Sequence, residues 1–278
     1  MTQSNSAAKA AALLLAEMSS YGRTLVAFSG GVDSSVVVAA AARALGKERM
    51  AAVTAVSPSL PAAELDAARG FCAGLGLTHL MVSTEELKNP GYSDNGRGRC
   101  YFCKSTLLDA ALRLAADEGF ETIATGTNAS DLTAGFRPGI GAAAERGART
   151  PLADAGLDKA AVRAVARLWS LPTWDKPAMA CLSSRIAYGL TITESRLARV
   201  ERAESAVRDL LVDRGRGNVR VRDLGGSVRL EVDRELVDEV RGDPRVTRAV
   251  RTAGFEGVPM SVEVFRSGSM NSMNEVPR

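Results

Sequence analysis

The segment Phe28–Ser35, FSGGVDSS, constrains the fold of this chain more than any other. It follows an apolar run at residues 23–28 that we interpret as a strand, and it precedes the apolar run Val36–Ala42, which we interpret as part of a helix. A Gly-Gly turn at the carboxyl end of a parallel strand lets the backbone approach a ligand closely, and the first N–H groups of the next helix carry a positive dipole end. The segment therefore predicts an anion-binding cradle.

Polar side chains in this segment fit an anion and its counter-ion. Ser29, Ser34 and Ser35 offer hydroxyl donors, and Asp33 offers a carboxylate that can hold a magnesium ion. An ordinary strand-to-helix turn also uses glycines, and two glycines alone would favour that simpler interpretation. No Lys-Ser/Thr pair follows the glycines, so the segment is not the nucleoside-triphosphate P-loop of kinases and GTPases.

Apolar periodicity predicts strands that alternate with helices in the first part of the chain. The predicted strands are 23–28, 50–56, 78–83 and 121–125, and the predicted helices are about 5–20, 34–46, 61–75, 103–118 and 157–171. This alternation implies an α/β fold, a parallel sheet with helices on both faces. Near residue 190 the pattern changes to a charged helix at 193–214, strands near 218–223, 227–233 and 260–265, and two short helices. We therefore predict an α/β domain at 1–190 and a smaller α+β domain at 191–278.

Composition excludes several classes of protein. With 46% hydrophobic residues, 278 residues can form a full core. The 35 basic and 32 acidic residues nearly balance, so charge does not call for nucleic acid or an anionic membrane as a partner. The first residues lack the features of a secretory signal, and no apolar run approaches the roughly 20 residues that span a bilayer. We expect a cytoplasmic protein without a membrane partner.

Cysteine, rather than histidine, offers reactive chemistry. The one histidine, His79, lies in a predicted strand, which nearly excludes a histidine triad or a histidine-rich metal site. Cys72 lies on an apolar helix, and we interpret it as inert core. Cys100, Cys103 and Cys181 lie in polar contexts, RCYFCK and KPAMACLSSR. In a cytoplasmic chain this spacing argues against structural disulfides.

Three polar cysteines leave more than one chemistry open. A structural zinc site usually takes four ligands, so it would need Cys72 as well. Three thiolates can hold three irons of a cubane iron-sulfur cluster and leave the fourth iron open for sulfide or substrate. A redox pair at Cys100 and Cys103 is a further alternative, because C-x-x-C alone is a weak signal. Neighbouring basic side chains at 99, 104 and 185 favour thiolates.

SGGVDSS after a strand resembles the signature of the PP-loop ATP pyrophosphatases. These enzymes split ATP between its α- and β-phosphates and leave an adenylylated substrate. The resemblance implies that seven residues surround the pyrophosphate: Ser29, Gly30, Gly31, Val32, Asp33, Ser34 and Ser35. A nucleophile must then displace AMP, and the three polar cysteines suggest sulfur.

The order of motifs narrows this resemblance to the sulfur transferases that mature the nickel-pincer cofactor of lactate racemase. The motifs extend over nearly the whole chain and are FSGGVDSS, RCYFCK, ATGTNASD (124–131), FRPG (136–139), ACLSSRIAYG (180–189) and FRSGSMN (265–271). Members adenylylate a carboxylate of a pyridinium dicarboxylate mononucleotide, convert it to a thiocarboxylate, and then treat the other carboxylate. One branch gives up the sulfur of a single cysteine, and another binds a 4Fe-4S cluster on three cysteines. This chain resembles the second branch.

The resemblance implies roles for further residues in the first domain. It implies cluster ligands at Cys100, Cys103 and Cys181. Lys104 and Arg185 flank these cysteines, and we interpret them as clamps for phosphate or oxyanion charge. Surface solubility is the simpler account of both basic residues. Candidate nucleotide contacts near the end of a predicted strand are Gly126, Asn128, Asp131 and Arg137. Loop capping is the simpler account of these polar side chains.

The second domain offers an alternating strand, in which Arg220 and Arg222 project from one face and valines from the other. A solvated edge is the simpler account. The resemblance favours a substrate or phosphate contact at a subunit interface, with Glu204 and Glu231 as acidic candidates for a metal. It also implies a homo-oligomer, with a hexamer as the expected form, and a separate sulfur donor system.

Three other functions compete with this one. A tRNA thiolation enzyme also joins a PP-loop to a C-x-x-C and a third cysteine, but it would be expected to show a stronger basic surface. An ammonia-using ligase of the NAD-synthetase or GMP-synthetase type would not need the three polar cysteines. A non-catalytic nucleotide-binding module would not need an intact pyrophosphate motif.

Overall fold

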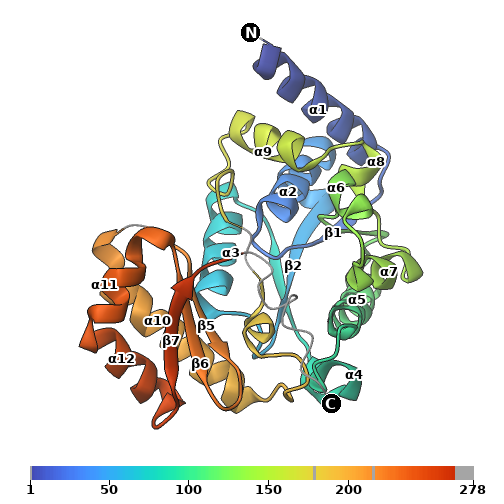
Figure 1. Cartoon of the computed structure of the whole chain (residues 1–278). Coiled ribbons are helices and arrows are strands. Elements are labelled where there is room, and N and C mark those ends of the chain that lie inside the picture. The colour runs from blue at the N-terminus through green and yellow to red at the C-terminus, as the bar shows by residue number, and fades with distance from the viewer. Residues whose placement is uncertain (1, 178–179, 215–216, 267–278) are drawn as a thin grey trace. The chain divides into compact units, whose positions relative to one another are not determined.

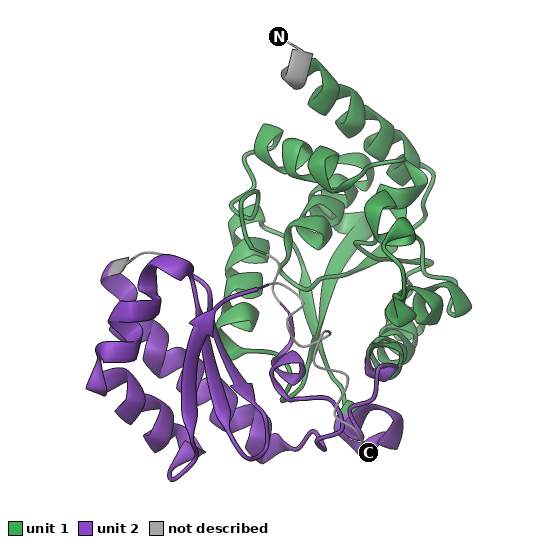
Figure 2. Ribbon diagram, viewed as in Figure 1, with its two compact units in different colours: residues 1–86, 100–179 green, residues 87–99, 180–278 purple. Residues whose placement is uncertain are grey.

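The computed structural model describes residues 2–177, 180–214 and 217–266. Its contacts divide the chain into two compact units: unit 1 contains residues 1–86 and 100–179, and unit 2 contains residues 87–99 and 180–278 (Figure 2). This division falls eleven residues before the predicted domain boundary, and it assigns residues 87–99 to the second unit. Within the described ranges, no helix is both long and apolar enough to cross a membrane.

Unit 1 is built on a sheet of four parallel strands in the order β3-β2-β1-β4 (Figure 1). The strands are β1 (Thr24–Ala27), β2 (Met50–Val56), β3 (His79–Ser83) and β4 (Thr122–Ala124). The helices are α1 (Thr2–Ser19), α2 (Val32–Leu45), α3 (Ala62–Leu75), α5 (Arg99–Glu118, of which Arg99 groups with unit 2), α6 (Ala129–Thr133), α7 (Pro138–Glu145), α8 (Pro151–Asp154) and α9 (Lys159–Leu168). The parallel α/β fold expected from the sequence is confirmed.

Helices cover both faces of this sheet because its strands are apolar on both sides. Successive side chains of a strand point to opposite faces, and β1 shows the consequence. Val26 packs into a core formed with α1, α2, α3 and α9, while Leu25 packs into a second core formed mainly with α5. Both residues are fully buried. Burial on both sides is typical of a parallel sheet, and it leaves only the strand ends available for function.

Unit 2 is a smaller α+β unit. Its sheet has the order β5-β6-β7, with β5 antiparallel and β7 parallel to β6. The strands are β5 (Val219–Asp223), β6 (Val228–Val232) and β7 (Met260–Val264), and the helices are α4 (Pro90–Ser93), α10 (Glu194–Leu210), α11 (Val237–Gly242) and α12 (Pro244–Val250). Helix α10 packs on β5 and α12. The predicted change of pattern after residue 190 corresponds to these elements.

The strand order of unit 1 fixes where a ligand can bind. From β1 the chain adds β2 and β3 on one side, and it then crosses to add β4 on the other side. Such a reversal is a topological switch point, and open α/β sheets bind ligands there, at the carboxyl ends of the strands. The FSGGVDSS segment follows β1 and the ATGTNASD segment follows β4, so both lie at this point.

Candidate active site

The glycine-serine loop forms a tight turn that enters α2. Gly30 has φ = 72°, a conformation that glycine adopts without strain. The carbonyl of Gly31 accepts hydrogen bonds from the Ser34 hydroxyl at 3.1 Å and from the Ser35 hydroxyl at 2.9 Å, and the Ser29 and Ser34 hydroxyls lie 3.2 Å apart. The serine side chains therefore hold the shape of the turn, and they lie where the N–H groups of α2 begin.

The loop after β4 meets this turn. A Cβ atom at Gly126 would lie 2.8 Å from the backbone nitrogen of Ser34, so only glycine fits there. The amide of Asn128 donates to Asp33 Oδ1 at 3.0 Å. Asn128 is also the N-cap of α6 and forms a capping box with Asp131. The structure thus brings the predicted residues at 126, 128 and 33 together.

Asp131 and Arg137 lie at the edge of this group. Asp131 caps α6, as the simpler account proposed, and an Arg137 nitrogen lies 3.6 Å from its carboxylate. Arg137 is about half exposed and so remains available for a ligand. Contact of either residue with the nucleotide stays a prediction.

Two lysines that the sequence did not single out complete the loop. Lys159, the first residue of α9, forms an ion pair with Asp33. Lys176 donates to the carbonyl of Gly30 at 3.0 Å and to Glu64 at 2.6 Å. The position of Lys176 at the start of KPAMACLSSR was the one available signal, because neither lysine belongs to the glycine-serine motif.

The cysteines differ in their surroundings. Cys72 is fully buried, and burial raises the pKa of its thiol to about 11, as expected of an inert core residue. Cys100 is exposed and Cys103 is partly buried, and both lie within the first five residues of α5. Their spacing of three residues places them on one face of the helix. All four cysteines are free of disulfides.

Lys104 follows Cys103 on α5. Burial lowers the pKa of Lys104, and the nearby negative charge of a Cys103 thiolate acts in the opposite direction. Its side chain also lies against Gly139, where a Cβ atom would be 3.6 Å from Lys104 Cβ. The structure therefore places Lys104 beside the cysteine pair and the FRPG motif, which is compatible with the predicted clamp.

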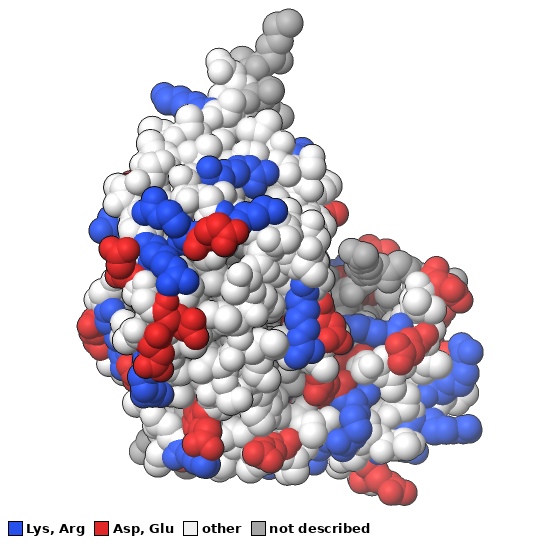
Figure 3. All heavy atoms as spheres, turned by 180° about the vertical axis from the view of Figure 1, so that it is seen from behind, with Lys and Arg blue, Asp and Glu red and all other residues white. Residues whose placement is uncertain are grey.

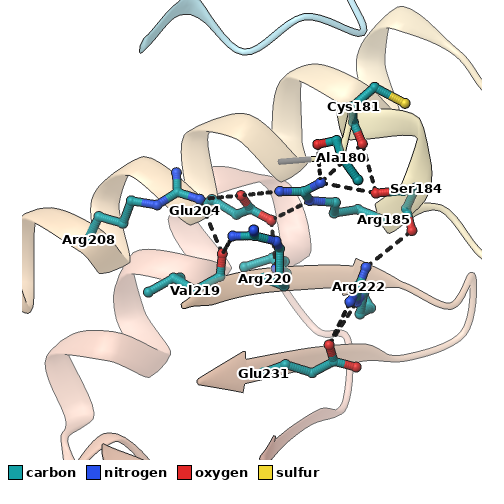
Figure 4. Close-up of polar contacts among 11 residues, drawn as sticks. Ala180, Cys181, Ser184, Arg185, Glu204, Arg208, Val219, Arg220, Arg222 and Glu231 are labelled. Carbon is teal, nitrogen blue, oxygen red and sulfur yellow. Dashed lines mark hydrogen bonds and ion pairs between the residues drawn. The ribbon is translucent and has the colours of Figure 1, made fainter. Parts of the chain in front are cut away.

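Cys181 lies in unit 2 and immediately precedes a short helical turn, Leu182–Arg185. The Cys181 carbonyl accepts from the Ser184 hydroxyl at 2.8 Å and from Arg185 at 3.1 Å (Figure 4). Cys100 and Cys103 belong to unit 1. Among the described residues, no group of three His, Cys, Asp or Glu side chains is gathered as a metal site. The donor set of three thiols suits an iron-sulfur cluster, whereas their convergence stays a prediction.

Arg185 is buried completely and contacts protein groups through all three guanidinium nitrogens. It forms a two-point ion pair with Glu204, at 2.8 and 3.2 Å, and it donates to the Ala180 carbonyl at 2.5 Å. This arrangement differs from both predicted accounts, a phosphate clamp and a solvated surface residue. In this structure Arg185 joins the Cys181 turn to α10.

Four arginines and two glutamates form what we call the arginine cluster, shown in Figure 4. Its members are Arg185, Arg208, Arg220, Arg222, Glu204 and Glu231. Arg220 and Arg222 are each only 5% exposed, so the account of a solvated edge is wrong. Both guanidinium groups contact protein groups instead of solvent: Arg222 donates to Glu231 and to the Ser184 carbonyl, and Arg220 donates to the Val219 carbonyl and lies over the Phe265 ring.

The carboxylates of this cluster are engaged by arginines. Glu204 accepts from Arg208 at 2.6 Å in addition to Arg185, and Glu231 accepts from Arg222 at 2.7 Å. Burial by itself raises the pKa of Glu204, but Arg185 and Arg208 outweigh it and hold the pKa below its usual value. These ion pairs differ from the predicted metal ligation, and nothing in the described part of the chain supports a metal at either carboxylate.

The cluster carries an excess of positive charge, since four arginines face two glutamates. Burial, followed by the charge of Arg185, lowers the pKa of Arg220 to about 10. A buried excess of positive charge is favourable for an anionic ligand. Residues 267–271 of the late FRSGSMN motif lie outside the described residues.

A parallel sheet with an SGGVDSS turn at its switch point defines a PP-loop ATP pyrophosphatase domain, and the NAD synthase family model matches residues 13–95. The chain is 33% identical to the pyridinium-3,5-bisthiocarboxylic acid mononucleotide synthase of Lactiplantibacillus plantarum over 261 residues. The matched region covers 94% of this chain and 93% of that protein. It is 43% identical over 252 residues to an uncharacterized protein of Synechocystis sp., with 90% of this chain and 92% of that protein covered.

The chain therefore belongs to the pyridinium-3,5-bisthiocarboxylic acid mononucleotide synthase family, within the PP-loop class. It is an ATP-using enzyme. The resemblance drawn from the motifs is confirmed.

Proposed function

We propose that this protein is an ATP-dependent sulfur transferase of nickel-pincer cofactor biosynthesis. It adenylylates a carboxylate of pyridinium-3,5-dicarboxylate mononucleotide and converts that carboxylate to a thiocarboxylate, releasing pyrophosphate and then AMP. The observation that carries the proposal is 33% identity to a synthase of the bisthiocarboxylic acid mononucleotide over 94% of the chain, a span that includes the PP-loop and all three polar cysteines.

The first step uses the loop between β1 and α2. The first N–H groups of α2 and the serine hydroxyls hold the β- and γ-phosphates. A carboxylate oxygen of the substrate attacks the α-phosphorus, and the bond to the bridging oxygen of pyrophosphate breaks. Asp33 is the proposed magnesium ligand, and its present partners are Lys159 and Asn128. A magnesium ion would neutralise phosphate charge as pyrophosphate leaves.

The second step forms the carbon-sulfur bond. Sulfide attacks the acyl carbon of the adenylate, and the bond to the AMP oxygen breaks, so AMP carries away the electron pair. A 4Fe-4S cluster on Cys100, Cys103 and Cys181 would supply that sulfide from its open iron. Lys104 beside Cys103 is proposed to stabilise the developing oxyanion, and the surplus charge of the arginine cluster is proposed to hold the substrate phosphate.

Contacts within unit 2 connect the segment just before Cys100 to the loop that follows Cys181. Asn95 is fully buried with φ = 57°, and its amide donates to the carbonyls of Ala187 at 2.8 Å and Leu190 at 3.1 Å. Arg99 donates to Asn95 and stacks on Tyr188. Cys100 is the next residue after Arg99, and Cys181 precedes this same loop by a few residues. The loop is thus connected to both cysteine motifs by short stretches of chain.

Other substrates have less support. On the face drawn in Figure 3, Lys and Arg side chains are interspersed with Asp and Glu, whereas a tRNA-binding surface would be expected to be more uniformly basic. The NAD synthase match is confined to residues 13–95, the region that holds the shared pyrophosphate loop. A small anionic substrate therefore accounts better for the chain. A homo-oligomer, with a hexamer as the expected form, remains part of the proposal, and light scattering tests it.

Separate cysteine variants test this function. The protein is purified without oxygen, analysed for iron and sulfide, and incubated with ATP, magnesium, sulfide and the dicarboxylate mononucleotide. We expect C100A, C103A and C181A to lose thiocarboxylate formation while retaining pyrophosphate release. C72A is the matched control and should form product normally, because Cys72 is core. Unchanged product formation by all three variants would reject sulfur transfer through these residues.

Mass spectrometry of the polypeptide then identifies the sulfur source. An unchanged mass at residue 181 after product formation supports delivery through the cluster. A loss of one hydrogen sulfide at residue 181 shows instead that Cys181 gives up its own sulfur.

A further inference from the structure

Lys176 makes an unusual pair of contacts at the nucleotide loop. Its ammonium donates to the carbonyl of Gly30 at 3.0 Å and to Glu64 Oε2 at 2.6 Å. Both charged side chains are largely buried, at 20% and 14% exposed. The ammonium also lies 3.7 Å from the position that a Cβ atom would take at Gly30. A largely buried lysine, paired with a glutamate, therefore donates a hydrogen bond to the backbone of the loop itself.

Another group must fix the orientation of the peptide that joins Gly30 to Gly31. Glycine adopts positive and negative φ about equally, so residue 30 does not by itself fix the orientation of the peptide that follows it. That peptide is planar and trans, which makes the Gly30 carbonyl and the Gly31 N–H point in opposite directions. Whatever holds the carbonyl therefore decides where the N–H points.

The neighbouring carbonyl is already held from inside the turn. The hydroxyls of Ser34 and Ser35 both donate to Gly31, as does the backbone nitrogen of Ser35 at 3.0 Å. Those contacts leave the Gly30 carbonyl as the part of the turn that the serines do not fix. Lys176 supplies the contact for it from outside the motif.

The backbone of Lys176 is fixed in turn by α9. Arg163 donates to the Trp174 carbonyl at 2.7 Å and to the Lys176 carbonyl at 2.9 Å. Lys176 therefore extends from an anchored segment, and Glu64 on α3 holds its ammonium from the other end. An anchored side chain loses less conformational freedom when it orients a ligand site.

We infer that Lys176 is a positioning residue for the nucleotide: by holding the Gly30 carbonyl, it directs the Gly31 N–H toward the pyrophosphate moiety of ATP. The inference rests only on the nucleotide-binding half of the proposed function, and it holds whether or not the enzyme transfers sulfur. It assigns Lys176 no contact with the substrate that is adenylylated.

Pyrophosphate, ATP and AMP are the probes for this role, with binding measured by calorimetry. Loss of one oriented N–H donor to a charged phosphate weakens binding by about 10- to 100-fold. We expect K176M to weaken the binding of pyrophosphate and of ATP to that extent. The affinity for AMP should change by less than about threefold, since AMP lacks the pyrophosphate moiety. K176R should restore most of the affinity, because a guanidinium can donate to both Gly30 and Glu64.

Lys47 provides a matched control. It also donates to a backbone carbonyl, that of Leu75, but it lies just before β2, at the opposite end of the sheet from the loop. K47M should bind all three probes as the wild type does. Binding of pyrophosphate by K176M within about twofold of the wild type overturns the inference, as does an equal loss of pyrophosphate and AMP.

A spectroscopic measurement on the wild type makes the test independent of how the variants fold. In protein labelled with 15N at glycine, the Gly31 amide should shift downfield when pyrophosphate binds, as expected for a new hydrogen bond to an anion. The shift should be absent in K176M and present in K47M. A wild-type Gly31 amide that does not move on saturation with pyrophosphate also overturns the inference. Absence of ATP binding in the wild type would contradict the nucleotide site itself.

Discussion

Removal of the charge on Glu204 gives a direct measure of what the arginine cluster contributes. Glu204 is 1% exposed and accepts from Arg185, from Arg208 and from the Val221 N–H at 3.0 Å. In E204Q the side chain keeps nearly the same shape, and its amide oxygen can still accept from Val221. Its NH₂ group, however, faces arginine donors, so Arg185 is left buried without a counter-charge.

The magnitude follows from the burial of each partner. Removing one member of a buried ion pair costs about 3–5 kcal/mol. Arg208 is 38% exposed and can turn to solvent, so the loss of its ion pair with residue 204 adds at most about 1 kcal/mol to the destabilisation. The retained Val221 hydrogen bond saves about 1 kcal/mol. We therefore expect E204Q to lower the free energy of unfolding of unit 2 by about 3 kcal/mol.

The assay must report on unit 2. Both tryptophans, Trp169 and Trp174, belong to unit 1, so their fluorescence does not suffice. Hydrogen exchange of the β5 amides in the native state reports unit 2 directly, and protection should fall by roughly 100-fold. The control is E263Q, because Glu263 pairs with Arg229 at 3.1 Å but is half exposed, and it should cost less than about 1 kcal/mol.

A double mutant checks the cause. If the loss comes from an uncompensated Arg185, then R185M combined with E204Q should be less destabilising than the sum of the two single changes. A loss for E204Q no larger than that of E263Q would refute the reasoning. So would strict additivity in the double mutant.

Three further predictions follow from particular residues. The folded pKa of Glu204 lies below its ordinary value of 4.5, so the stability that its ionised form contributes is present above the unfolded pKa and is lost as pH falls through the folded pKa. The difference in free energy of unfolding between the wild type and E204Q should therefore shrink below about pH 4.5 in acid titrations. Iodoacetamide at pH 8 should label Cys100 and leave Cys72 unlabelled in the native protein, as peptide mass spectrometry will show, since burial raises the pKa of Cys72 to about 11; labelling of Cys72 at the rate of Cys100 would contradict this. G126A should lower the free energy of unfolding by about 1–3 kcal/mol in thermal denaturation and weaken ATP binding, because its Cβ would meet the Ser34 nitrogen. G141A in α7, with open space around it, should be neutral or stabilising. Equal effects of the two changes would exclude a close approach at 126.

Local patterns predicted the α/β unit well. The strand predicted at 50–56 matches β2 residue for residue, because its apolar run is buried within the parallel sheet. Helix α5 begins at Arg99, four residues before the predicted start, since its first turn, RCYF, lacks a clear apolar period. The short helices α4, α6, α7 and α8 were not predicted, because elements of four to eight residues are too short to show a period.

Long-range contacts explain what the sequence could not show. Residues 87–99 group with unit 2 through contacts such as those of Asn95 with the loop at 186–190, some 90 residues away. The glycine-serine loop was predictable because all of its polar groups lie within seven consecutive residues. Lys159 and Lys176 reach it only through the packing of α9 and the segment after it, and a single lysine carries no periodic signal.

The contacts of Arg185 also depend on tertiary packing and could not be predicted from the sequence. They determine how Arg185 acts on Cys181. From the sequence, an arginine four residues after a reactive cysteine suggests a charge that acts on the ligand directly. The structure instead directs that guanidinium at Glu204 and at the carbonyls of Ala180 and Cys181. A carbonyl held in this way fixes the backbone from which the Cys181 thiol projects. The thiol of Figure 4 points away from the arginine cluster. Arg185 therefore acts on residue 181 through the backbone, while its own charge is matched by Glu204 on α10.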